Sequence, residues 1–157
     1  MQHPSTLTQR QAAILGGVSI LVMVAAVIVA IPSTLSLIVE GDAAKTVQNI
    51  VNAGSTFRVG VAAWMVIVLC DLIVSLAFYV VLKEVNAGLS LLTAWFRLFY
   101  TALLGMLTLL FLAVLLLVGS SKSLVGFSSL QINSLVLFLL TIFRQGWFFA
   151  LFFFGWR

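Results

Sequence analysis

Apolar residues dominate four long stretches of the chain, and short polar segments separate them. The stretches cover residues 12–31, 57–82, 88–118 and 134–156. An α-helix of about 20 apolar residues crosses the ~30 Å hydrocarbon core of a bilayer, and each stretch reaches that length. The pattern therefore predicts an all-α fold, a polytopic transmembrane helical bundle with about four spans and one short interfacial helix.

The first span lies close to the N-terminus and so resembles a signal peptide. It follows Arg10, and Pro32 is expected to end it. No clear small-x-small cleavage site precedes a polar mature start, which favours a retained signal-anchor helix. Small residues recur at four-residue spacing in the pairs Ala12 and Gly16, Ala13 and Gly17, and Ala26 and Ala30. Such faces let helices approach closely, either inside the bundle or at a seam with another subunit.

The main polar segment, VEGDAAKTVQNIVNAGSTF, follows the first span at residues 39–57. Asp42 is suited to cap a helix over about residues 43–53, and Gly54 is suited to end it. Val47, Ile50 and Val51 share one face of that helix. We expect an interfacial helix that rests on the bilayer or on the bundle; a lid over a site is the alternative.

The link between the second and third spans, KEVNAG at residues 83–88, is short, so these spans must be antiparallel neighbours. Counting outward from this link places Asp71 and Arg97 at depths that differ by about 5 Å, at ~1.5 Å per residue. An unpaired charge at such a depth costs at least about 2.5–3.5 kcal/mol. We therefore predict a charge-assisted, hydrogen-bonded pair between Asp71 and Arg97.

Helical spacing adds polar neighbours to this pair, because Thr93, Tyr100 and Thr101 fall on the face of Arg97. Arg144, near the middle of the fourth span, either shares Asp71 or extends toward an interface. If it shares Asp71, two arginines face one carboxylate and leave a net positive charge. That charge could bind an anion, a lipid phosphate, a quinone-like head group or an acidic residue of another chain. The candidate intramembrane polar cluster, with a structural or a ligand-binding role, is Asp71, Arg97, Arg144, Thr93, Thr101 and Tyr100.

Composition supports the membrane assignment and argues against several functions. The 157 residues are 63% hydrophobic and only 8% charged, far outside the range of soluble domains. The net charge of +4 comes from scattered basic residues, so we expect no nucleic-acid partner. The single histidine is His3 and the single cysteine is Cys70, and no catalytic triad, metal cluster or phosphate loop is evident. We expect no enzymatic activity and no metal or cofactor; a bound lipid, quinone or pigment stays open.

Basic residues near the span ends indicate the orientation only through a small asymmetry. In a four-span topology one side of the membrane has Arg10, Lys83 and Arg157, and the other side has Lys45, Arg58 and Lys122. Arg97 leans toward the first group. By the positive-inside rule, we expect both termini in the cytoplasm.

Several short motifs occur across residues 12–112: GDAA, FRVG, LCD, VN followed by LSLL, and FRL, with GWFFALFFFG in the last span. With these motifs the chain resembles a bacterial integral membrane family, domain of unknown function 4386. The resemblance implies a multi-span protein of the bacterial plasma membrane without an established activity. Family members usually continue into further apolar segments and tend to carry a histidine near the position of Arg144. The resemblance thus implies a shortened member that associates with other membrane chains.

Two functions follow as competing hypotheses. The first is an accessory or structural subunit of a membrane protein assembly, with Asp71 and Arg97 fixing the bundle. The alternative is a small transporter, or a binder of a lipid-like or quinone-like ligand, that uses the intramembrane Asp/Arg cluster. The sequence shows no broken-helix pattern or inverted repeat of the kind typical of transporters.

Overall fold

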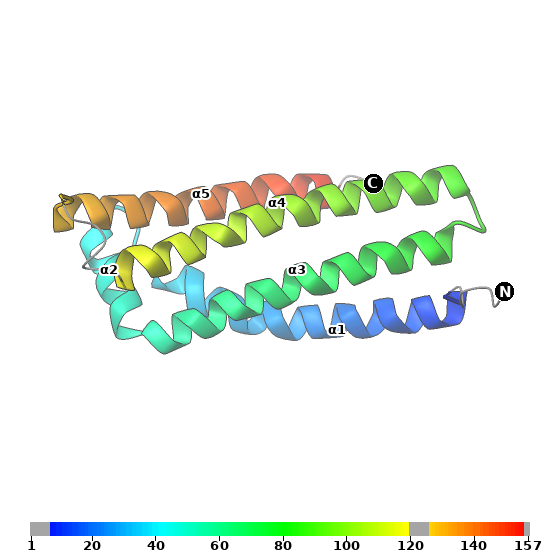
Figure 1. The fold of residues 1–157 in the computed structure, drawn as a ribbon, viewed down its shortest axis with the longest axis horizontal. Coiled ribbons are helices and arrows are strands. Elements are labelled where there is room, and N and C mark those ends of the chain that lie inside the picture. The colour runs from blue at the N-terminus through cyan, green and yellow to red at the C-terminus, as the bar shows by residue number, and fades with distance from the viewer. Residues whose placement is uncertain (1–6, 120–125, 156–157) are drawn as a thin grey trace.

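Four long helices form the body of the protein. The computed structural model describes residues 7–119 and 126–155, and in the last helix the side chains as far as residue 152. The long helices are α1 (Gln9–Thr34), α3 (Gly54–Leu82), α4 (Ala87–Gly119) and α5 (Ser129–Gly155). They run along one common axis, and the short α2 (Ala43–Asn52) lies across one end (Figure 1). All four are long and apolar enough to cross a membrane, so the chain is a multi-pass, all-α membrane protein.

Two helices begin earlier than the apolar pattern predicts, because capping boxes extend them. The Thr8 hydroxyl accepts from the Gln11 backbone N–H at 3.3 Å, and the Gln11 side chain accepts from the Thr8 N–H at 3.1 Å. Ser128 and Gln131 make the same reciprocal bonds at the start of α5. These bonds satisfy N–H groups that a helix start leaves without partners. The fourth helix thus starts at Ser129 rather than near residue 134.

The expectation that Pro32 ends the first helix is wrong. Helix α1 continues through Pro32 to Thr34 and passes into a 3₁₀ turn, η1 (Leu35–Leu37). Proline has no N–H to donate to the carbonyl four residues earlier, and its ring crowds that carbonyl, but here it falls in the last turn, where the helix is about to end. The Thr34 hydroxyl also donates to the Ala30 carbonyl at 2.7 Å, which supports that turn.

Helix α2 begins as expected, because the Asp42 side chain accepts from the Lys45 backbone N–H at 2.8 Å. Thr46 and Ile50 are buried against the bundle, whereas Val51 is exposed. Gly54 does not end α2; it is the first residue of α3, and only Ala53 separates the two helices. The helix therefore packs as a cap on one end of the bundle.

Helices α1 and α3 pack antiparallel at very short range. A β-carbon added to Gly16 would lie 2.9 Å from that of Ala77, and one added to Gly60 would lie 2.7 Å from that of Ser33. The two contacts are 17 residues apart on each helix (33 − 16 and 77 − 60), so the register is constant between them. The buried face of α1 includes Ala12, Gly16 and Ala30. These small residues therefore pack inside the bundle, which was one of the two roles expected for them. Gly17 faces outward and has open space around it.

Aromatic side chains fill the core between α3, α4 and α5 on the α2 side. Trp64 lies 4.9 Å from Phe143 and 5.3 Å from Trp147, measured between ring centroids. Phe111 of α4 lies 4.1 Å from Phe143. The Trp64 indole N–H donates to the Thr34 hydroxyl at 3.1 Å, which ties this core to the end of α1. The core fixes the depth at which the polar groups of α3 and α4 meet.

Candidate functional site

A buried ion pair joins α3 to α4 near the middle of the bundle. Asp71 lies 17 residues after the first residue of α3 and 11 before the last (71 − 54 and 82 − 71), and it is fully buried. The Arg97 guanidinium donates to one carboxylate oxygen through Nη2. The Thr101 hydroxyl donates to the other oxygen. The pairing predicted from the length of the hairpin is therefore confirmed.

Both partners of Asp71 come from one face of α4. Arg97 and Thr101 are four residues apart, so successive turns of the helix place them side by side. The Thr101 hydroxyl is also 2.8 Å from the Arg97 carbonyl oxygen, and it thus lies between the α4 backbone and the carboxylate. The guanidinium carbon stands 5.1 Å from the centre of the Phe78 ring, within cation–π range. Only 12% of the Arg97 side chain is exposed.

Two serines extend this polar contact toward the hairpin. The Ser75 hydroxyl on α3 donates to the Ala94 carbonyl on α4 at 3.2 Å. The Ser90 hydroxyl on α4 donates in the opposite direction, to the Tyr79 carbonyl, at 2.8 Å. Side chains that bond a backbone carbonyl across a helix pair hold the two helices in one register. The spacing analysis did not identify Ser90, because a serine near a helix start is unremarkable in sequence.

The structure does not bring Thr93 to Asp71, whereas Tyr100 lies within range of the charges of both Asp71 and Arg97. Thr93 is exposed one turn nearer the hairpin, and its hydroxyl donates to the Leu89 carbonyl at 2.9 Å. Tyr100 is buried, and a side-chain hydrogen bond joins it to Trp147 of α5. Because an indole can only donate, the tyrosine oxygen accepts in that bond. The cluster therefore contains Asp71, Arg97 and Thr101 with Tyr100 close by, and Thr93 lies outside it.

Arg144 does not share Asp71. Its Nη1 donates to Glu40, in the link between η1 and α2, and the two side chains form a second ion pair. The sequence analysis did not identify Glu40 as a partner. The order of the spans could have indicated this pairing. Because α1 ends and α5 begins at the same end of the bundle, Glu40 and the first half of α5 lie toward one side of the membrane.

The arginines deep in α4 and α5 are therefore each matched by one carboxylate. Asp71 pairs with Arg97 and Glu40 pairs with Arg144, within the part of the chain that the structure describes. An excess of positive charge around Asp71 was the reason to expect an anionic ligand there. With Arg144 engaged elsewhere, that reason no longer applies.

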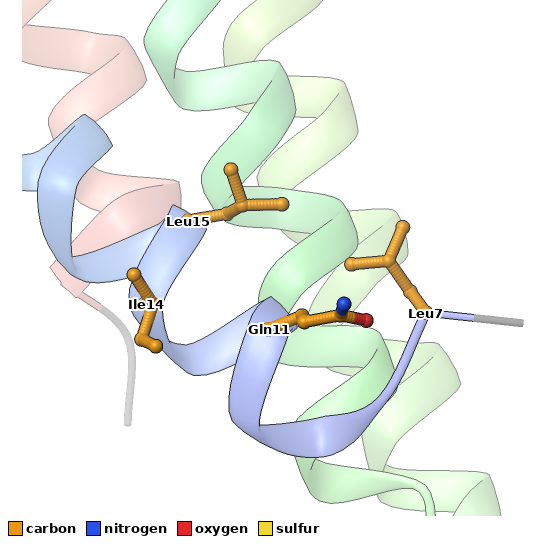
Figure 2. Close-up of a pocket in the computed structure, with 4 residues that line it drawn as sticks. All are labelled: Leu7, Gln11, Ile14 and Leu15. Atoms are coloured by element: carbon orange, nitrogen blue, oxygen red, sulfur yellow. The ribbon is translucent and has the colours of Figure 1, made fainter.

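A pocket lies away from these residues, on the outer side of the first turns of α1. Leu7, Gln11, Ile14 and Leu15 line it, and none of them is charged (Figure 2). Cys70 is a free thiol buried beside Asp71. Across residues 7–119 and 126–152, no group of three His, Cys, Asp or Glu side chains is placed to hold a metal ion.

Comparisons with known proteins agree with the fold and leave the activity open. Neither the curated proteins nor the solved structures gave a match to this chain. One family model matches residues 15–157, which covers α3, α4, α5 and most of α1. The match includes Glu40, Asp71, Arg97 and Arg144. The chain belongs to the family described as Domain of unknown function (DUF4386).

Proposed function

We propose that this chain is a non-catalytic, accessory or structural subunit of a membrane protein assembly. The observation that carries the proposal is the engagement of both carboxylate oxygens of Asp71 within the bundle. One carboxylate oxygen accepts from Arg97 and the other from Thr101, all within the bundle. A carboxylate held in this way fixes α3 against α4 and is poorly placed to exchange protons or bind a ligand.

The alternative of a transporter or a ligand binder at the Asp/Arg cluster has less support. Such a function needs a cavity that reaches the charged groups near the midplane. The pocket in Figure 2 is lined by Leu7 and by three residues in the first turns of α1, and the Asp71 cluster does not line it. Arg144, the third member of the cluster in that hypothesis, is paired with Glu40.

The outer faces of the long helices suit contact with lipid and with other membrane chains. Large apolar side chains are exposed on each of them, including Leu21 of α1 at 72%, Trp95 of α4 at 63% and Phe149 of α5 at 63%. In addition, α5 ends well short of the end of α4 at the α3–α4 hairpin (Figure 1).

We place the protein in the bacterial plasma membrane with both termini in the cytoplasm. Four crossings return the chain to the side on which it began. Arg10 and Lys83 lie on that side. With Arg157 and with Arg97, which leans toward it, this side has four basic residues against three on the other, which supports a cytoplasmic location. Lys45 and Arg58 then face the opposite aqueous phase.

The test is purification of the tagged chain from its native membrane in a mild detergent, followed by mass determination of the intact particle. We expect a particle heavier than one 17.0 kDa chain with its detergent, containing further copies or a second polypeptide in a fixed ratio. A matched preparation of an unrelated four-span protein of similar size controls for non-specific association. A monodisperse monomer with no co-purifying chain overturns the proposal.

A further inference from the structure

A polar side chain faces outward from the body of α5. Gln145 lies 16 residues after the first residue of α5 and 10 before the last (145 − 129 and 155 − 145), or about 24 Å and 15 Å along the helix axis. Its side chain is exposed, and no hydrogen bond engages it among the residues that the structure describes. A glutamine amide has two N–H donors and an acceptor oxygen, and hydrocarbon satisfies none of them.

Gln145 belongs to an outward-facing row of residues, which we call the α5 seam. Its members follow one another at alternating spacings of three and four residues, and each one is exposed: Leu135, Phe138, Ile142, Gln145, Phe149 and Phe152. The fully buried residues of α5 lie on the other side of the helix, toward the bundle: Val136, Leu140, Phe143 and Ala150. Two positions in every seven, repeated along one face, are the pattern by which two helices pack side by side.

Lipid can cover the apolar members of the α5 seam, but it cannot satisfy Gln145. The partner of this amide must both donate and accept hydrogen bonds at the same depth. A second copy of the chain, inserted in the same orientation, meets that requirement. A two-fold axis along the membrane normal places the two Gln145 side chains at one depth and opposite each other. Each amide then donates one N–H to the oxygen of the other, because a primary amide is complementary to itself.

We propose that the α5 seam binds the α5 seam of a second copy of this chain, in a parallel and symmetric dimer. Reciprocal hydrogen bonds between the two Gln145 amides hold its register. A shift by one repeat of seven residues places Gln145 opposite Phe138 or Phe152 and leaves both amides without partners, so a single polar position selects one alignment. The inference rests on the proposed role as a subunit and identifies the partner as a second copy.

The first experiment maps the α5 seam by disulfide formation in the native membrane. Single cysteines are introduced into the full-length chain in a Cys70→Ala background, and mild oxidation is followed by electrophoresis without reductant. We expect Ile142→Cys and Phe149→Cys to form covalent dimers. Phe148→Cys is the matched control, because Phe148 is as exposed as Phe149 (62% and 63%) but lies beside the seam, and it should stay monomeric.

The second experiment measures the dimer dissociation constant of the purified full-length chain in detergent, by energy transfer between two differently labelled populations. Gln145→Leu is expected to raise this constant about tenfold, because it removes the reciprocal hydrogen bonds. Gln145→Asn keeps the amide on a shorter side chain and should recover part of the loss. Thr93→Val, a polar-to-apolar change at an exposed position of α4, is the control and should leave the constant unchanged. Circular dichroism checks that each variant keeps its helices.

Three results overturn the proposal. Equal dimer formation by Phe148→Cys and Phe149→Cys would indicate random collision rather than a seam. A dissociation constant that Gln145→Leu does not change would show that the amides do not pair. A particle that contains one copy of this chain with a different polypeptide excludes the symmetric dimer but leaves the proposed subunit role standing, whereas a lone monomer excludes both.

Discussion

Gly60 of α3 approaches Ser33 of α1 so closely that a β-carbon on the glycine would lie 2.7 Å from that of the serine. Real β-carbons essentially never come within 3.0 Å of a neighbour, so something would have to shift. The Ser33 carbonyl carbon would also lie only 3.2 Å away, which leaves little room on the backbone side. The two helices therefore touch almost backbone to backbone here, a contact that small residues make accessible inside membranes.

The first prediction concerns this contact. Gly60→Ala is expected to destabilise the protein by about 1–3 kcal/mol, because the added methyl overpacks the α1–α3 contact. The loss should appear although alanine has the higher helix propensity by up to about 1 kcal/mol. Gly17→Ala is the control, since its β-carbon would meet nothing within 4 Å, and it should leave stability unchanged or raised. Unfolding of the purified variants in detergent measures both, and equal stabilities would contradict the tight α1–α3 contact.

The second prediction concerns the buried ion pair. Asp71→Asn and Arg97→Gln, each made alone, are expected to cost about 3–5 kcal/mol, because each leaves an uncompensated charge inside the membrane. The double variant removes both charges and should cost clearly less than the sum of the two single changes. The amount of folded protein in the membrane and its resistance to unfolding in detergent are the measurements.

An exchange of the two residues sharpens this test. Asp71→Arg combined with Arg97→Asp should recover part of the assembly that either single reversal loses. Recovery is expected to be incomplete, because Thr101 is then placed to donate to a carboxylate on its own helix rather than on α3. A double exchange no better than the single reversals would mean that the pair is not what holds α3 to α4.

The third prediction separates two threonines of α4. Thr101→Val removes a hydroxyl that donates to Asp71, and we expect a loss of about 1–3 kcal/mol because a buried carboxylate oxygen loses its donor. Thr108→Val is the matched control, since that buried hydroxyl donates to the Leu104 carbonyl of its own helix at 2.8 Å. Removing it should be nearly neutral. Comparable losses in the two variants would show that the Thr101 bond to Asp71 adds nothing.

The sequence was sufficient to predict the ion pair at Asp71 because a short hairpin leaves few choices. The five residues between the apolar stretches 57–82 and 88–118 force antiparallel neighbours, and the ~1.5 Å rise of a helix then converts sequence distance into depth. Counting from the hairpin therefore places Asp71 beside Arg97. The same rule cannot rank the polar neighbours, and Thr93 lies on the predicted stripe yet one turn away from the carboxylate.

The Glu40–Arg144 pair could not be predicted in the same way, because 104 residues separate its members. Its geometry depends on where α1 stops and on the path of the link to α2. Both were misjudged from sequence, since Pro32 was expected to end the helix and Gly54 to follow α2 rather than to begin α3. Close contacts between neighbouring helices, such as Leu107 of α4 against Gly146 of α5, likewise depend on how far one helix is shifted along the other. The pattern of residues within a single helix does not contain that information.

The fourth prediction concerns orientation. In a Cys70→Ala background, Lys83→Cys is expected to react with a membrane-impermeant thiol reagent only from the cytoplasmic side, and Lys45→Cys only from the opposite side. Both positions are exposed and lie at opposite ends of the bundle. Labelling of intact cells compared with inverted membrane vesicles makes the measurement. The reverse pattern would place both termini outside the cytoplasm and contradict the proposed orientation.

The fifth prediction concerns the bond between Trp64 and Thr34, which joins the aromatic core to the end of α1. Trp64→Phe and Thr34→Val each remove one partner of a buried hydrogen bond of 3.1 Å. A double-mutant cycle should give a coupling energy of about 0.6 kcal/mol and at most about 1.7 kcal/mol, the average and the maximum for such bonds between membrane helices. Trp64→Phe combined with Thr108→Val is the control cycle, because no hydrogen bond of the structure joins Trp64 to Thr108, and it should give a smaller coupling. Detergent unfolding of the four proteins in each cycle provides the energies. Strict additivity of Trp64→Phe and Thr34→Val would mean that α1 is held at this level by its close packing on α3 alone.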